Sequence, residues 1–310
     1  VFGRGMISDD TEHALFVAQC LLRSPTDSTN FARRLGWCLR GWLLGLPAGI
    51  GFATLRAICK LWLGFSPNYS GVNSAGNGPA MRVAIIGAFF ADDRERRLAY
   101  VTASTRVTHT DPKALAGATA IAELAAWIVR DHLEQRPALS AFIELLRSCG
   151  SRDQEWLAIV DKIERAARSG STVAVLADRL GLSKGATGYI YHTVPIVAYA
   201  WFRHFGDFRT ALIEVLDCGG DTDTTGAIVG ALAGAVVGEA GIPLDWREGV
   251  IDWPRSLSLL RALAQRLSLA ASARQPLAPV RYFWLAIPLR NLVFLLIVLI
   301  HGFRRLLPPY

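Results

Sequence analysis

The apolar side chains of this chain recur with the period of an α-helix along most of its length, and this pattern limits the fold more than any other feature. Helical runs cover residues 11–22, 112–130, 140–149, 151–168 and 224–238. Alternating patterns typical of strands are few, and the apolar segment 81–90 fits either element. We therefore expect an all-α protein.

The composition sets the size of the core and narrows the class of partner. With 310 residues, of which 52% are hydrophobic, the chain can form one large domain or two modest ones. Its formal net charge is +7, but lysines and arginines are scattered, so we expect no nucleic-acid partner. Five cysteines, an odd number without a C-x-x-C pair, favour a reducing, cytoplasmic location.

An acidic pair, Asp221 and Asp223, stands in the stretch DCGGDTDTTGAIVGALAGAVVG. Gly219 and Gly220 suit a tight turn that delivers both carboxylates to one place. Side chains at i and i+2 point apart on a helix, so we expect the pair in a loop, with a helix starting near Thr224. Two carboxylates this close repel each other unless a cation lies between them.

Behind this pair, glycines recur every fourth residue, at positions 226, 230, 234 and 238, and form a smooth stripe. Another helix can pack closely against such a stripe. A membrane helix is the alternative interpretation, but the apolar run is shorter than the roughly 20 residues that span a bilayer. We therefore expect close packing in a soluble core.

A second acidic pair lies near the N-terminus, where Ser8, Asp9 and Asp10 immediately precede a helical pattern. Such residues are ordinary N-caps, and acidic side chains are favoured at a helix N-terminus, so capping is one interpretation. The other is metal binding, because S-D-D-T and D-T-D-T each place hydroxyl and carboxylate oxygens at a helix start. Oxygen ligands without His or Cys suit Mg²⁺ or Mn²⁺. If the two pairs converge, more than one divalent ion is needed to balance them.

Four segments, SDDTEHAL, SAGNGPAMR, ASTRVTHTDPKALAGA and GGDTDTTGAIVGALAGA, occur in an order that resembles the ADP-ribosylglycohydrolase family, which includes the dinitrogenase reductase-activating glycohydrolases. The resemblance covers about residues 7–244. It implies an orthogonal helical bundle, residues 1–270 here, with two Mg²⁺ ions in a central cleft and Mn²⁺ as the alternative ion. The metal ligands that it implies are Ser8, Asp9, Asp10, Asp221, Asp223 and Thr224.

The loop SAGNGPAMR is interpreted as a substrate contact through Gly76, Asn77 and Gly78. Glycines let backbone N–H groups approach a ligand, which suits the diphosphate of ADP-ribose. The alternative is a plain loop that leads into a helix, since that has the same composition.

Two aromatic rings are further candidates for substrate contacts. His109 can hydrogen-bond the ligand or merely close a turn before a helix. Tyr189, presented by a turn at Gly188, is either a stacking surface for adenine or ribose or an ordinary core aromatic.

The resemblance implies a Mg²⁺-dependent hydrolase that removes ADP-ribose from a modified protein or a related ADP-ribosyl conjugate. Metal ions would orient the ribose and activate a water, and carboxylates would carry protons, with Asp10 and Asp223 as the catalytic candidates. Negative charge near the sugar also favours an oxocarbenium-like state.

Two other function classes stay open. One is a protein that binds ADP-ribose or another nucleotide without hydrolysing it. The other is a metal-dependent glycosyl or phosphoryl transferase, since D-x-D also occurs in nucleotide-sugar sites. The transferase interpretation leaves S-D-D-T and GNGPAMR unexplained.

Both ends of the chain depart from the family pattern. The chain opens with Val1, so we expect a fragment or a processed product. The resemblance implies a further segment before S-D-D-T, with a G-D-x-x-G-like turn and an acidic residue near the metals, and the residues before Ser8 do not match it.

At the other end, residues 271–310 form an apolar tail that contains FWLAIPLRNLVFLLIVLIHGF. This run is long enough to cross a bilayer, but Arg290 near its centre would cost about 2.5–3.5 kcal/mol there. Two interpretations remain: contact with a membrane, and a helix packed on the domain or on a partner.

Overall fold

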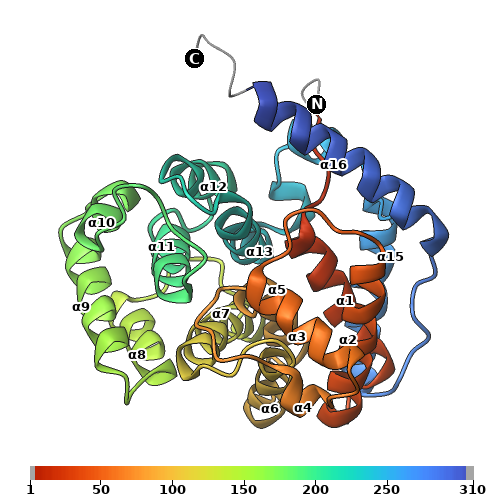
Figure 1. The fold of residues 1–310 in the computed structure, drawn as a ribbon. Helices are drawn as coiled ribbons and strands as arrows, with labels where there is room; N and C mark the ends of the chain where they lie inside the picture. The colour runs from red at the N-terminus through yellow and green to blue at the C-terminus, as the bar shows by residue number, and fades with distance from the viewer. Residues whose placement is uncertain (1–3, 305–310) are drawn as a thin grey trace.

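The computed structural model describes residues 4–304, which form sixteen α-helices and one 3₁₀ helix (Figure 1). The helices are α1 (Asp9–Arg23), α2 (Ser28–Leu44), α3 (Phe52–Trp62), α4 (Pro67–Ser70), α5 (Ala80–Phe89), α6 (Arg94–Arg106), α7 (Pro112–Arg130), α8 (Leu139–Cys149), α9 (Gln154–Arg168), α10 (Val173–Arg179), α11 (Ile190–Arg203), α12 (Phe208–Asp217), α13 (Thr222–Gly241), α14 (Leu244–Gly249), α15 (Leu257–Ala273), η1 (Trp284–Ala286) and α16 (Ile287–Arg304). Within this range no β-strand forms, and four isolated backbone bridges occur. The expected all-α fold with a C-terminal apolar helix is confirmed.

The observed helix boundaries lie close to the helical runs of the sequence. The run at 112–130 is α7 itself, and the ambiguous segment 81–90 corresponds to helix α5. One expectation is wrong, because α13 begins at Thr222: Asp221 is its N-cap and Asp223 lies in its first turn rather than in a loop. Acidic side chains are favourable at both positions, since the first N–H groups of a helix carry partial positive charge.

Helices α5, α7, α11 and α13 form the centre of the molecule, with α8–α10 on one side and α1, α2 and α15 on the other (Figure 1). The most extensive helix contact joins α5 and α7. These two helices approach closely because Gly87 has no side chain, and a Cβ there would lie 2.2 Å from the backbone oxygen of Ala122. One continuous apolar core extends through both sides of the bundle.

Two of the four glycines in the α13 stripe face α12, whereas a Cβ at Gly230 or Gly238 would have no neighbour within 4 Å. A Cβ at Gly226 would lie 3.2 Å from Leu216, and one at Gly234 would lie 3.7 Å from Phe208. The face of α13 that enters the core is a different one, which carries the fully buried Leu232. The expected close packing is therefore found against one neighbouring helix, and α13 is a central element of the bundle.

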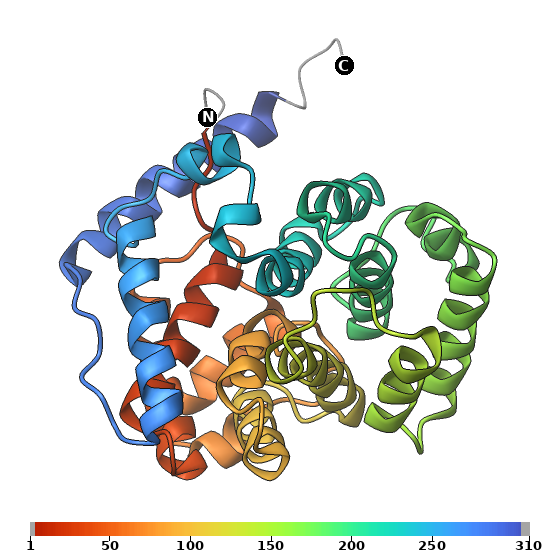
Figure 2. The same cartoon turned by 180° about the vertical axis from the view of Figure 1, so that it is seen from behind.

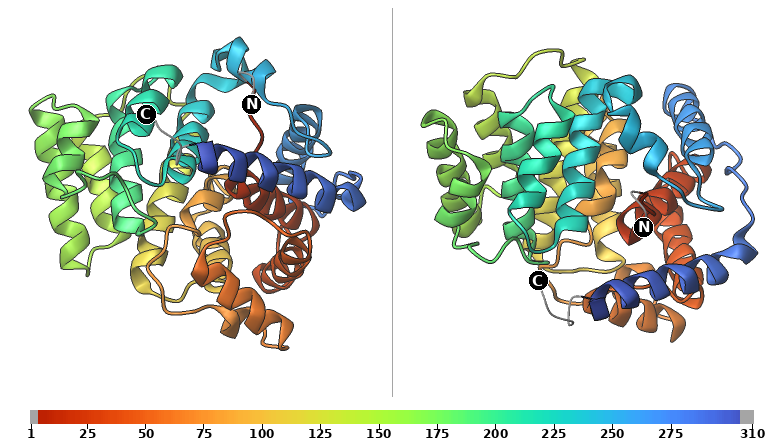
Figure 3. Two further views of the ribbon diagram at one scale, coloured as in Figure 1. Left: turned by 45° about the horizontal axis from the view of Figure 1, so that its top comes forward. Right: turned by 90° about the horizontal axis from the view of Figure 1, so that it is seen from above.

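The C-terminal elements pack back on the start of the chain. α15 lies beside α1 (Figure 2), where Leu263 meets Leu15 and Leu22 in a second, smaller apolar cluster. α16 lies across the end of the molecule that contains the start of α1 (Figure 3). By length and composition, three helical segments of the described chain could cross a membrane: α7, α13 and Trp284–Arg304. The first two are central helices, whereas only 24% of the most apolar window of the third is buried.

Candidate functional site

A cavity of about 360 Å³ lies where the starts of α1, α5 and α13 meet. Nine of the twelve predicted site residues line it: Asp9, Gly76, Asn77, Gly78, His109, Gly188, Asp221, Asp223 and Thr224. Ser8, Asp10 and Tyr189 lie outside the lining. Further lining residues, which the sequence patterns did not single out, are Gly49, Gly51, Phe52, Ala53, Thr54, Ser74 and Met81. Segments that are far apart in the sequence thus converge on one cavity.

The two acidic pairs converge beside this cavity. Side-chain oxygens of Asp9, Asp10 and Asp223 lie within 4.8 Å of one another. Asp10 is buried behind the lining, where its Oδ2 accepts a hydrogen bond of 2.8 Å from the Ser8 hydroxyl and its Oδ1 has no partner. A buried carboxylate oxygen without a partner is costly, and a cation at this position would satisfy it.

The carboxylates of this cluster are difficult to ionise together. Burial, followed by the charges of Asp10 and Asp223, raises the pKa of Asp9 to about 8. Burial also raises the pKa of Asp10, although hydrogen bonds from neighbouring hydroxyls act in the opposite direction and lower it. Burial and the adjacent Asp221 raise the pKa of Asp223 to about 6. A divalent cation among these oxygens would offset the repulsion between them.

The chemistry of the donors fits a hard divalent cation. The residues whose ligand atoms come together are aspartates alone, without histidine or cysteine. Mg²⁺ and Mn²⁺ prefer oxygen ligands, whereas Zn²⁺ usually takes nitrogen and sulfur. The acidic cluster therefore fits the metal ions that the sequence predicted.

Asp221 is positioned by a close backbone contact between the loop before α11 and the turn before α13. Its N–H donates to the carbonyl of Ala186 at 2.7 Å. Gly220 has a φ of +82°, and a Cβ there would lie 2.0 Å from the same carbonyl oxygen. Only glycine permits both this backbone angle and this approach. The predicted glycine turn is therefore confirmed, and the approach of Ala186 is its physical reason.

Asn77 links three elements around the cavity. Its side-chain amide donates to Asp221 Oδ2 at 2.7 Å and to the Thr193 hydroxyl on α11 at 2.9 Å. Its backbone N–H donates to the carbonyl of Gly188 at 2.8 Å. The GNGPAMR loop therefore orients the carboxylate of Asp221.

The two glycines of the same loop make room for His109. A Cβ at Gly76 would lie 2.8 Å from His109 Nε2, and one at Gly78 would lie 3.2 Å from its Cε1. The buried imidazole has its Nδ1 2.8 Å from the Thr108 hydroxyl. Burial and the charge of Arg82 lower the pKa of His109 to about 3. The ring is therefore neutral and lines the cavity as a hydrogen-bonding group.

Arg82, also in the GNGPAMR motif, was not among the predicted site residues. Its buried guanidinium donates to the Ser104 carbonyl at 2.8 Å and to the Thr108 hydroxyl at 2.7 Å, so it holds the residue that contacts His109. Burial lowers the pKa of Arg82 to about 10. The available signal was an arginine inside the apolar run AMRVAIIGAF, because a charged residue there needs buried partners.

Gly188 and Tyr189 lie immediately before α11, where the backbone of Tyr189 forms a bridge with Gly76. Gly188 lines the cavity, but the phenol of Tyr189 is turned to other partners. Its hydroxyl donates to Glu155 at 2.8 Å and accepts from Lys113 at 3.1 Å. The structure thus places Tyr189 beside the glycine loop, and its role in stacking stays a prediction.

Glu12, inside the SDDTEHAL motif, is a buried anion that the sequence interpretation passed over. It accepts hydrogen bonds from the guanidinium of Arg255 and from the indole of Trp42. All three side chains are buried. This face of α1 is therefore tied to α2 and to the segment that precedes α15.

A second buried ion pair holds the residue before the acidic segment of α1. Ile7 donates its N–H to Asp252 Oδ2 at 3.2 Å, and its carbonyl accepts from Arg290 Nη2 at 2.5 Å. Arg290 also donates its Nε–H to Asp252 Oδ2 at 3.1 Å. The arginine that interrupts the apolar C-terminal run is thus directed into the protein.

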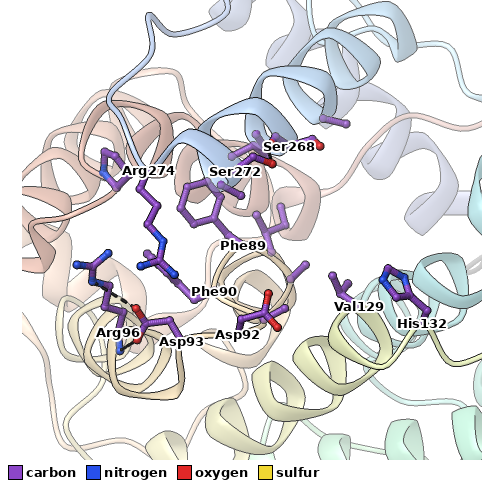
Figure 4. Close-up of a pocket in the computed structure, with 17 residues that line it drawn as sticks. Phe89, Phe90, Asp92, Asp93, Arg96, Val129, His132, Ser268, Ser272 and Arg274 are labelled. Atoms are coloured by element: carbon purple, nitrogen blue, oxygen red, sulfur yellow. Dashed lines mark hydrogen bonds and ion pairs between the residues drawn. The ribbon is translucent and has the colours of Figure 1, made fainter.

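A larger cavity of about 630 Å³ lies between the end of α5, the start of α6 and α15 (Figure 4). Phe89 and Phe90 contribute to its apolar lining, together with Ile85, Val129 and Leu267. Two of its charged groups have structural roles, since Asp93 caps α6 and pairs with Arg96 at 3.5 Å. None of the predicted site residues lines this cavity, so size does not identify the functional site.

The sequence is similar to known proteins. The ADP-ribosylglycohydrolase family model matches residues 1–276. An uncharacterized protein of Archaeoglobus fulgidus is 34% identical over 251 residues, which cover 80% of this chain and 76% of that protein. The ADP-ribosyl-(dinitrogen reductase) glycohydrolase of Rhodospirillum rubrum is 27% identical over 251 residues, which cover 78% of this chain and 72% of that protein.

An animal protein and a solved structure extend the comparison. The ADP-ribosylhydrolase ARH3 of Gallus gallus is 25% identical over 277 residues, covering 78% of this chain and 72% of that protein. A structure described as an ADP-ribosylglycohydrolase-related protein complex matches with a TM-score of 0.59 and 25% identity, covering 86% of this chain and 80% of that chain. Since the family model spans most of the chain and the motif residues meet at one cavity, this chain belongs to the ADP-ribosylglycohydrolase family.

Proposed function

We propose that this chain is a Mg²⁺-dependent hydrolase that releases ADP-ribose from a modified protein or from a related ADP-ribosyl conjugate. The observation that carries the proposal is the approach of the Asp9, Asp10 and Asp223 oxygens to within 4.8 Å of one another, beside a cavity of about 360 Å³. Family membership supports the class of substrate. The similarity to an ADP-ribosylhydrolase and to a glycohydrolase supports hydrolysis over binding alone.

Two Mg²⁺ ions, with Mn²⁺ as the alternative, would be held by Ser8, Asp9, Asp10, Asp221, Asp223 and Thr224. Bound Mg²⁺ supplies positive charge that orients ribose hydroxyls and makes a bound water more acidic. Asp10 or Asp223 would take the proton of the attacking water and return it to the departing acceptor group. The charge of the remaining aspartates would stabilise the oxocarbenium-like state as the bond at the anomeric carbon breaks.

The other lining residues would hold the rest of the substrate. The neutral His109 offers a hydrogen bond, and the backbone at Gly78 lines the cavity where a diphosphate would approach. Phe52 lines the same cavity and is 74% exposed, so its ring is free to cover a ribose or an adenine. Tyr189 is the second candidate for stacking.

The proposal is tested with peptides that carry ADP-ribose on arginine or on serine. Free ADP-ribose is measured by chromatography with Mg²⁺, with Mn²⁺ and with a chelator. Asp10→Asn and Asp223→Asn should each reduce the rate about 100-fold or more, because each removes a candidate ligand and proton carrier. Asp178→Asn, at an exposed position on α10, is the matched control and should keep full activity.

Calorimetry separates hydrolysis from binding alone. A chain that binds ADP-ribose but releases none from either peptide, with either metal, would be a binding protein and would contradict the proposal. Full activity in Asp10→Asn or Asp223→Asn would contradict the assignment of the acidic cluster.

A further inference from the structure

Helix α16 has its polar side chains on the inside and its apolar side chains on the outside. Between Ile287 and Ile300 the only polar residues are Arg290 and Asn291, and both are buried against the rest of the protein. Most of the exposed residues of α16 are large and apolar: Leu289, Leu292, Val293, Leu295, Leu296, Val298, Leu299, Ile300 and Phe303. A helix on the surface of a water-soluble protein has the opposite arrangement.

The exposed apolar surface extends around most of this helix. From Leu292 onward, the exposed side chains spread over about 220° of the circumference, taking about 100° per residue from 3.6 residues per turn. A helix that packs on one protein partner needs an apolar stripe of only about 100°. A fluid apolar solvent, by contrast, contacts every side that the protein leaves free.

The charge of this region complements an anionic surface. Residues 253–310 contain eight arginines and no lysine, aspartate or glutamate, and two of these arginines, Arg255 and Arg290, are buried and paired with Glu12 and Asp252. Residues 253–310 account for the whole formal net charge of +7, because residues 1–252 contain one more acidic than basic side chain. Arg281 and Arg304, which flank η1 and α16, are exposed. Arginines beside an apolar helix attract anionic phospholipid headgroups.

Exposed aromatic rings gather at the N-terminal end of the helix. Trp253, Phe283 and Trp284 are 59%, 57% and 67% exposed, and the rings of Trp253 and Phe283 lie 6.0 Å apart. Trp284 lines a shared cavity with Trp37 and Leu44 of α2, which are also exposed. Tryptophan is enriched where a protein meets the headgroup layer of a membrane.

We propose that the outer face of α16 binds the surface of an anionic lipid bilayer, with the helix lying in the plane of the interface. The helix does not leave the domain, because Arg290 pairs with Asp252 and Asn291 donates to the carbonyl of Gly45 at 2.7 Å. Its apolar outer residues enter the boundary of the acyl chains, while Arg281 and Arg304 meet the headgroups.

Vesicle flotation with the full chain tests this proposal. The probes are vesicles of phosphatidylcholine alone and of an equimolar mixture with phosphatidylglycerol. The triple variant Leu292→Ser, Leu296→Ser, Leu299→Ser should lower the partition coefficient at least about tenfold, because three leucines lose their apolar contact. The matched control, Leu63→Ser, Leu244→Ser, Leu269→Ser, changes three leucines that are more exposed but lie elsewhere, and it should float like the unchanged chain.

The expected result is strong flotation with the anionic vesicles, weaker flotation with the neutral ones, and loss of both in the outer-face variant. An unchanged chain that stays at the bottom with anionic vesicles would overturn the proposal, as would an outer-face variant that still floats. Light scattering without lipid provides a further check. A dimer that only the outer-face substitutions dissociate would assign this surface to a second copy of the chain instead.

The inner face of α16 carries a second inference, which rests on the proposed function. The guanidinium of Arg290 donates to the carbonyl of Ile7, one residue before Ser8, and shares Asp252 with the N–H of Ile7. We infer that Arg290 is a positioning residue, which holds the segment that leads into the acidic start of α1. Without it, this segment keeps the bond from the Ile7 N–H to Asp252 and the backbone bonds of Gly5 to Gly249 and Ile251.

Metal affinity tests this role, with Mn²⁺ as the probe and electron paramagnetic resonance as the readout. Arg290→Met should weaken Mn²⁺ binding about tenfold, at the lower end of the range for residues that support metal ligands. Arg290→Lys keeps the charge and should recover part of the affinity. The control is Arg261→Met, which removes an exposed arginine paired with Glu239.

The double variant Arg290→Met, Asp252→Asn guards against a loss of fold, since it leaves no single buried charge without its partner. Unchanged Mn²⁺ affinity in a folded Arg290 variant would overturn the inference. If the unchanged chain itself binds no Mn²⁺, the result contradicts the proposed metal site. A failure of the proposed function is therefore distinguishable from a failure of the inference about Arg290.

Discussion

The two helix starts beside the cavity carry the same acidic chemistry but are held in different ways. At α13, Asp221 is held by a backbone bond to Ala186 and by the side chain of Asn77. At α1, the backbone before the aspartates is held by Asp252 and Arg290, which lie 245 and 283 residues from Ile7 in the sequence.

This difference separates two ways of positioning the aspartates of the acidic cluster. The α13 half depends on a backbone approach that only glycine allows, so the absence of a side chain is what matters there. The α1 half depends on buried charges from the C-terminal part of the chain, so it is sensitive to any loss of pairing. The losses of stability caused by substitutions on the two sides should therefore differ in size and in physical cause.

The largest effect is expected for Asp252→Asn on the α1 side. It leaves the buried charge of Arg290 with only Glu12, 3.8 Å away, and should reduce the free energy of unfolding by about 3–5 kcal/mol. Urea denaturation measures this loss. Asp245→Asn, which breaks an exposed pair with Arg209, should cost less than about 1 kcal/mol. Similar small losses in both variants would show that the buried pair does not hold α1.

On the α13 side, Gly220→Ala should cost about 2–4 kcal/mol, because strain at positive φ adds to a clash with Ala186. Gly219→Ala is the matched control. Its φ is +72° but no atom lies within 4 Å of the added Cβ, so only the strain of about 1 kcal/mol remains. Thermal and urea unfolding measure both losses of stability. Equal losses in Gly220→Ala and Gly219→Ala would show that the close approach of Ala186 is not the cause.

A smaller loss is expected for Asn77→Ala, which removes the amide that donates to Asp221 and Thr193. The expected cost is about 1–2 kcal/mol, in the range of one hydrogen bond to a charged group. Mn²⁺ titration should also show weaker binding, since the Asp221 carboxylate loses its orientation. Asn68→Ala, at an exposed position on α4, should change neither quantity. Unaltered stability and Mn²⁺ affinity in Asn77→Ala would argue against an orienting role.

The last effect depends on pH and concerns Asp9 in the protein freed of metal with a chelator. The pKa of Asp9 is about 8 in the fold against an ordinary value of 3.8, so the folded state keeps a proton that the unfolded chain has lost. Stability therefore falls as the pH rises from about 4 to about 8. Asp9→Asn cannot lose this proton, and its Tm relative to the unchanged chain should rise across that range. A Tm difference that is independent of pH would contradict the raised pKa.

Much of the fold follows from patterns that are visible along the chain. The run at 112–130 is α7 without any change of boundary, because its helical period and the Pro112 start are local signals. The two acidic pairs were also readable, since carboxylates this close in the sequence repel each other unless a cation lies between them. The ambiguous segment 81–90 was decided by packing, as α5 lies against α7 along its length.

Local sequence patterns could not predict which residues pair with the buried charges. Glu12, Arg82 and Arg290 are each buried and need a partner, but the identity of that partner depends on elements far away in the sequence. Tyr189 is a different case. One interpretation placed its ring against the ligand, but in the structure its hydroxyl is hydrogen-bonded to Glu155 and Lys113.

The sequence by itself determined the helical class, the two acidic helix starts and the glycine turn, because periodicity, charge spacing and backbone freedom are properties of neighbouring residues. Only the tertiary structure decided that the two starts meet, that Gly76 and Gly78 make room for His109, and that the arginine of the apolar tail faces inward. The physical reason is that a buried charge needs an oppositely charged or hydrogen-bonding partner, and a glycine position needs the group for which it makes room. Only the fold brings these partners together.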